Sequence, residues 1–85
     1  MAIPRLSEAA FLATLREPLR ALDCTPKVLA RIRPHLPEGT VVHGVSESFD
    51  GMFTHVLAPA GTDRWLTFVI NNASGLLTGY FLMAV

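Results

Sequence analysis

The chain has 85 residues, of which 51% are hydrophobic and only 16% are charged. This length allows a single domain, residues 1–85, with a thin core, and the formal net charge of zero argues against strong sequence-independent binding to nucleic acid. So small a domain cannot bury all of these apolar side chains by itself, so we expect a partner surface, a ligand or a membrane to cover the remainder.

Residues 7–36 form the predicted helical part of the chain. Ser7 is suited to cap the N-terminus of a first helix, whose apolar side chains recur at helical spacing: Phe11, Leu15, Leu19 and Leu22. An interior proline removes a backbone hydrogen bond and clashes with the preceding turn. We therefore expect this helix to be kinked at Pro18, or to break there with Pro18 opening a second short helix.

A further helix is predicted after residue 25. Thr25 followed by Pro26 is the pattern of an N-cap and a first helical position. Pro34 should end this helix near Arg33, because the residue before a proline is disfavoured in the helical region.

Residues 40–85 form the predicted sheet part. The runs TVVHGVSES and MFTHVLA flank Asp50 and Gly51, which is a strong signal for a β-hairpin, and a two-residue loop there would pair Val45 with Val56. The runs RWLTFVI and LLTGYFLMAV flank a second turn, residues 71–75. We therefore expect an α+β fold, with two N-terminal helices followed by a four-stranded antiparallel β-meander.

The stretch from residue 66 to residue 85 carries no charge and is long enough to span a bilayer as a helix. Its middle, NNASG, favours a turn, and the residues on both sides favour strands. We therefore predict a terminal hairpin and no contact with a membrane.

Both faces of the last two predicted strands are apolar, although an antiparallel sheet with one solvated face should alternate. Two short helices can cover one face, so we expect the other to bind a second copy of the chain or a different protein. The leading hypothesis is a non-enzymatic association module, either a homodimer or the small subunit of a larger assembly; in the alternative, the kinked helix covers both faces of a monomer. The expected interface is Trp65, Val69, Tyr80 and Leu82, with Met52 or Phe53 on the adjoining strand.

Two histidines and a carboxylate in the first hairpin give a second hypothesis, a small-ligand or metal-binding protein. His43, His55 and Glu47 offer the donor types that zinc and other transition metals use. The register of a two-residue loop puts the two histidines on opposite faces, whereas a bulge at Gly44 would bring them to the same face. Partly exposed structural histidines are the alternative interpretation.

Basic side chains on the predicted helices give a third hypothesis. Pairs four residues apart share a helix face, and the set is Arg16, Arg20, Lys27, Arg31 and Arg33. The order of helices and sheet resembles the layout of the RelE-like ribonuclease toxins, which implies an RNA-binding or ribonuclease activity through these faces. Those toxins are strongly basic, whereas this chain is neutral, and a solvated helix face explains the same pattern.

The sequence carries no Gly-rich phosphate loop, nucleophile elbow or carboxylate pair at a useful spacing. These absences favour a non-enzymatic protein without a cofactor, with a protein as the partner, but an enzyme is not excluded, because catalytic groups can converge from distant positions in the sequence. Cys24 precedes a predicted helix, where a thiol can be activated, but no Cys-His signature accompanies it. A lone cysteine fits a reducing compartment, so a cytoplasmic location is expected.

Overall fold

Five antiparallel strands form one sheet in the computed structural model, which describes residues 3–16 and 18–84. Their order in the sheet is their order in the chain: β1 (Leu19–Leu22), β2 (Gly44–Ser48), β3 (Phe53–Pro59), β4 (Arg64–Asn71) and β5 (Leu76–Ala84). The helical elements are α1 (Glu8–Thr14), α2 (Pro26–Ile32) and the short 3-10 helix η1 (Arg33–His35). The predicted α+β class is confirmed, with one strand more than expected.

Helix α1 begins where the sequence predicts and ends much earlier. The Ser7 Oγ accepts a hydrogen bond of 3.1 Å from the backbone N–H of Ala10, and the backbone is already extended at Leu15. The predicted continuation, kinked at Pro18, is wrong: Leu19–Leu22 is strand β1 and pairs with β2. A helix through Pro18 would lose a backbone hydrogen bond, whereas the edge of β2 supplies partners to the backbone of β1.

Helix α2 follows its prediction closely. The Thr25 Oγ1 accepts a hydrogen bond of 3.3 Å from the N–H of Val28, and Pro26 occupies the first helical position. The α-helix ends at Ile32, and η1 adds one tighter turn that contains Pro34.

The two predicted hairpins are present, and Val45 pairs with Val56 as expected. The uncharged stretch forms β4 and β5 with a turn after Asn71; its last residue, Val85, lies outside the described residues. Among the helices described, none has the length and apolar character needed to cross a membrane.

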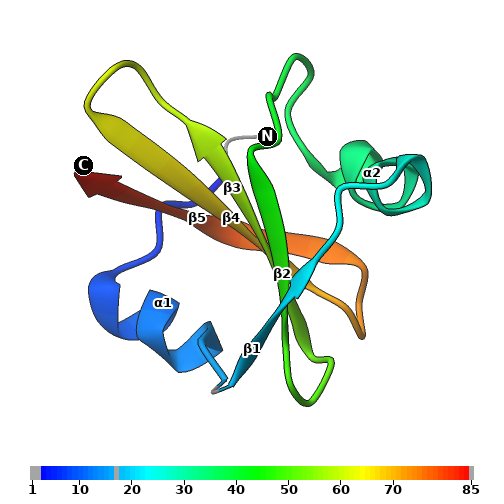
Figure 1. The fold of residues 1–85 in the computed structure, drawn as a ribbon. Helices are drawn as coiled ribbons and strands as arrows, with labels where there is room; N and C mark the ends of the chain where they lie inside the picture. Colours follow the sequence, from blue (N-terminus) through cyan, green and yellow to red (C-terminus); the bar gives the residue numbers. More distant parts are fainter. Residues whose placement is uncertain (1–2, 17, 85) are drawn as a thin grey trace.

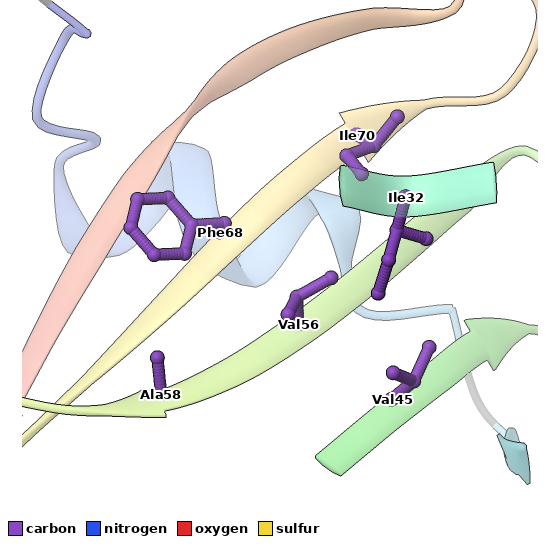
Figure 2. Packing of buried hydrophobic residues seen from close by; sticks show 6 residues of the cluster. All are labelled: Ile32, Val45, Val56, Ala58, Phe68 and Ile70. Atoms are coloured by element: carbon purple, nitrogen blue, oxygen red, sulfur yellow. The ribbon is translucent and has the colours of Figure 1, made fainter. Parts of the chain in front are cut away.

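The two helices lie on opposite faces of the sheet (Figure 1). On one face, Ile32 of α2 packs into the main core, which Figure 2 shows; its buried members are Ile32, Val45, Val56, Ala58, Phe68 and Ile70. On the other face, the ring of Phe11 in α1 stacks on that of Phe81, with centroids 4.4 Å apart. The expectation that both helices cover one face is therefore wrong, because the chain crosses the sheet edge as β1 between them.

The N-terminal segment covers part of the free edge of β5. The N–H of Leu6 donates to the carbonyl of Tyr80 at 2.7 Å, and the N–H of Tyr80 donates to the carbonyl of Pro4 at 3.0 Å. Gly79 makes this approach possible, since a Cβ there would lie 2.6 Å from the Pro4 oxygen.

Candidate functional site

A cavity of about 300 Å³, which is open to solvent on one side, lies on the α1 face of the sheet. Helix α1 is only seven residues long, so it covers part of this face, and the β2 residues beneath are small. The residues that line this α1 cavity include Phe11, Leu15, Leu19, Gly44, Ser46, His55 and Leu57. Side chains of the helix and of the following strand thus form apolar walls, while Gly44 and Ser46 leave the space empty.

His55 is the most deeply buried titratable group of the α1 cavity, with 4% of its surface exposed. Its Nε2 lies 3.0 Å from the Oγ1 of Thr14 in α1. The ring of Phe11 meets it edge-on, with centroids 6.1 Å apart and planes at 89°. These contacts fix the imidazole between the helix and the sheet.

The second ring nitrogen of His55, Nδ1, is buried and has no hydrogen-bond partner within residues 3–16 and 18–84. Leaving a buried acceptor unpaired costs about 1–3 kcal/mol. Burial also lowers the pKa of His55 below its ordinary value of 6.5, because desolvation disfavours the charged ring. The site therefore holds a neutral imidazole with one unused polar atom.

His43 and Glu47 do not join His55. Two consecutive residues lie opposite Leu57. The N–H of His43 donates to the carbonyl of Leu57, and Gly44 is the cross-strand neighbour of Leu57. This is the arrangement of a β-bulge at the place the sequence suggested. The His43 ring nevertheless packs on Trp65, with centroids 4.8 Å apart.

Glu47 accepts a hydrogen bond of 3.1 Å from Arg20, its cross-strand neighbour. Within the part of the chain that the structure describes, no three or more His, Cys, Asp or Glu residues are grouped so that they could hold a metal ion. The geometry gives no support to the predicted metal site.

The four residues of the expected interface are divided between the two faces of the sheet. Trp65 and Val69 pair with Met83 and Gly79, on the α1 face, whereas Tyr80 and Leu82 pair with Phe68 and Leu66, on the α2 face. The sequence-based assignment of side chains to the two faces did not include the register shift between Val69 and Ile70.

The pairing next to the turn, Ile70 with Leu77, would match Trp65 with Leu82 if it continued along the strands. The shift moves every later pair by one residue and so inverts which side chains share a face. Val69 is also fully buried. The expected interface is therefore not a single surface of this chain.

Three large apolar side chains at the turn end of the sheet are well exposed. Phe49 is 77% exposed, Leu76 68% and Met52 42%; we call these three residues the turn-end patch. Phe49 and Met52 lie in the β2–β3 turn, and Leu76 begins β5 directly after the β4–β5 turn. The two turns are tied together, because the Asn72 side-chain amide donates to the Gly51 carbonyl at 2.8 Å.

The predicted basic residues do not form one patch. Arg16 lies 3.8 Å from Asp50 and Arg20 pairs with Glu47, since the segment that carries them is not helical beyond Thr14. Arg33 donates to the carbonyl of Thr40. Lys27 and Arg31 remain on α2, and Arg31 borders a polar cavity of about 240 Å³ together with His35, Glu47 and Asn72.

The sequence analysis missed Thr14, which contacts His55, and Ser46, which borders the α1 cavity. Thr14 lies three positions after Phe11, so a polar residue on the apolar stripe of the helix was the available signal.

Comparisons with protein-family models, curated proteins and solved structures find no match to this chain. The candidate function therefore depends on the geometry of the site.

Proposed function

We propose that the protein binds a small, largely apolar molecule in the α1 cavity. The observation that carries this proposal is a largely apolar space of about 300 Å³, which the buried residue His55 helps to line. Ligand sites combine apolar walls with a few placed polar groups in the same way. This is the small-ligand hypothesis from the sequence, with His55 retained and His43 and Glu47 left out.

The volume of the α1 cavity limits the size of the ligand that it can hold. An engineered apolar cavity of about 150 Å³ binds benzene. A cavity of about 300 Å³ is sufficient for one aromatic ring with a short alkyl chain. Propylbenzene is therefore a suitable probe for the space itself.

The experiment is an NMR titration of the ¹⁵N-labelled protein with propylbenzene, compared with the Gly44→Val variant. Gly44 borders the cavity, and a Cβ built there meets nothing within 4 Å. Valine should therefore enter the empty space and prevent binding without disturbing the sheet.

The control is Thr78→Val, which adds a methyl group in place of a hydroxyl at an exposed position of β5. The proposal expects saturable shifts around Phe11 and His55 in the native protein and in Thr78→Val, and none in Gly44→Val. Absence of saturable shifts in the native protein would refute it.

We propose self-association as a second function, in which the partner is another copy of the chain. The exposed turn-end patch favours it, and the formal net charge of zero means that two copies do not repel each other. This retains the association hypothesis with a different surface.

Light scattering tests this second proposal. A mass near twice 9.2 kDa that returns to the monomer value in Leu76→Lys, but not in Thr78→Lys, is the expected result. A monomer at millimolar concentration would exclude it.

A further inference from the structure

A second cavity, of about 240 Å³ and partly open to solvent, lies at the turn end of the α2 face. Helix α2 and η1 line one wall, and strands β2, β3 and β4 with the two turns beyond them line the other. Its polar side chains are Arg31, His35, Glu47, Thr54 and Asn72; we call it the α2 cavity. Charged groups in its walls distinguish it from the α1 cavity and suit it to a polar ligand.

Glu47 is a carboxylate on the core face of β2. It lies two positions after Val45 of the main core, so both side chains point to the α2 face, and only 14% of the Glu47 side chain is exposed. Its Oε2 accepts a hydrogen bond of 3.1 Å from Arg20, whose own side chain is exposed. An ion pair with such an exposed partner is weak, so Glu47 keeps the capacity to bind a further cation.

The other carboxylate oxygen of Glu47, Oε1, is available to a ligand. Within residues 3–16 and 18–84, no N–H or O–H donates to it, and the only buried side-chain nitrogen or oxygen without a partner there is Nδ1 of His55. Oε1 is therefore accessible to solvent. A Cβ built at Gly51, which also lines the α2 cavity, would lie 3.7 Å from Oε1, so the free oxygen lies at the cavity wall.

Thr54 and Asn72 already have partners. The Thr54 hydroxyl donates to the Asn72 Oδ1 at 2.8 Å, and the Asn72 amide donates to the Gly51 carbonyl at the same distance. Thr54 is also only 1% exposed. These two residues fix the shape of the sheet wall and leave Glu47 as its charged group.

The opposite wall carries hydrogen-bond donors. Arg31 lies in the last turn of α2, beside the buried Ile32, and neither of the two ion pairs among the described residues involves it. His35 lies over the β4–β5 turn, where its Cε1 is 4.0 Å from a Cβ built at Gly75. A guanidinium offers a fork of N–H donors that matches a carboxylate, so this wall is suited to an anionic group.

We infer that the α2 cavity binds a small zwitterion, an amino acid whose ammonium group donates to Oε1 of Glu47 and whose carboxylate accepts from Arg31 and His35. A ligand with a carboxylate alone would meet repulsion from Glu47, and a ligand with an amine alone would meet repulsion from Arg31. A zwitterion pairs with both walls through charge-assisted hydrogen bonds. This site is independent of the α1 cavity, which lies on the other face of the sheet.

The test is an NMR titration of the ¹⁵N-labelled protein with three zwitterions of increasing length: glycine, 4-aminobutyrate and 6-aminohexanoate. We expect saturable shifts at Gly51, Asn72 and Gly75 with at least one of them. The analogues of the same length that lack either the amine or the carboxylate should bind about tenfold more weakly or worse, the effect of losing a hydrogen bond between charged groups. An analogue that binds as tightly as its zwitterion, or no saturable binding by any of the three, overturns the inference and leaves the proposed function intact.

Variants with matched controls test the two charged residues. Glu47→Gln and Arg31→Gln keep the approximate shape of each side chain and should each weaken zwitterion binding about tenfold or more. Lys27→Gln removes a charge from α2 outside the cavity and should leave binding unchanged. Arg20→Gln removes the ion pair but keeps the Glu47 carboxylate, so it should also retain binding.

Unchanged binding in Glu47→Gln or in Arg31→Gln overturns the assigned role of that residue. Loss of binding in Arg20→Gln would show that the ion pair, and not Oε1 of Glu47, is what the ligand requires, and would overturn the inference. The comparison of zwitterions with their singly charged analogues uses the native protein, so it does not depend on how any variant folds.

Discussion

The two faces of one sheet are completed in different ways. On the α2 face, Ile32 belongs to one buried cluster with side chains of β2, β3 and β4 (Figure 2). On the α1 face, Phe11 and Thr14 contact side chains of β3 and β5, and a cavity is left above Gly44 and Ser46 of β2. The comparison indicates that the α2 face is packed more completely than the α1 face.

The largest expected effect is on the packed face. Ile32→Ala removes a side chain that is 1% exposed, and such truncations cost about 2–5 kcal/mol. Leu15→Ala, on the wall of the α1 cavity, should cost only about 1 kcal/mol, because its half-buried side chain already borders empty space. Urea unfolding of both variants measures the difference, and equal losses would contradict the contrast between the faces.

Gly79 tests a tightly packed place on the α1 face. A Cβ at Gly79 would come within 2.6 Å of the Pro4 carbonyl oxygen and 2.8 Å of the Leu6 side chain. Gly79→Ala should therefore lower the free energy of unfolding by about 1–3 kcal/mol. Thr78→Ala, at the exposed neighbouring position, is the control and should change it by less than about 0.5 kcal/mol.

The pH dependence of stability tests the burial of His55. Its pKa in the folded protein lies below the ordinary value of 6.5, so the unfolded chain takes up the proton first as the pH falls. Its contribution to stability is therefore complete above about pH 6.5 and is lost as the pH falls towards the folded pKa. Unfolding free energies measured between pH 7.5 and 5.5 should decline in the native protein, and decline less in His55→Phe.

The smallest expected effect has the opposite sign. Gly44→Val places a β-branched side chain in a strand, over open space, and should raise the free energy of unfolding by about 0.5–1 kcal/mol. A loss of stability in thermal or urea unfolding would mean that the space above Gly44 is already filled.

Local signals in the sequence were sufficient for the elements whose ends are chemically marked. The Thr25 and Pro26 cap, the Asp50-Gly51 turn and the turn after Asn71 were all located from residue types alone. Strand β1 was not, because its leucines continue the helical spacing of α1, and only pairing with β2 decides between helix and strand.

Sequence could not determine which side chains share a face in the last hairpin. One register shift, between Val69 and Ile70, puts Trp65 and Leu82 on different faces of the sheet. No residue type at that position predicts the shift. The sequence could name His55 as a candidate but could not predict its contact with Thr14. That contact depends on where helix α1 packs, and Thr14 lies 41 positions from His55 in the sequence.

Xenon binding tests the central claim most directly, because xenon enters apolar cavities without requiring any particular polar group. NMR spectra of the ¹³C-methyl-labelled protein under xenon pressure should show saturable shifts at Leu15, Leu19 and Leu57, which border the α1 cavity. The methyl groups of Ile32 and Val56, on the packed face, should not respond. Shifts confined to the α2 face, or absent from both, would contradict the account.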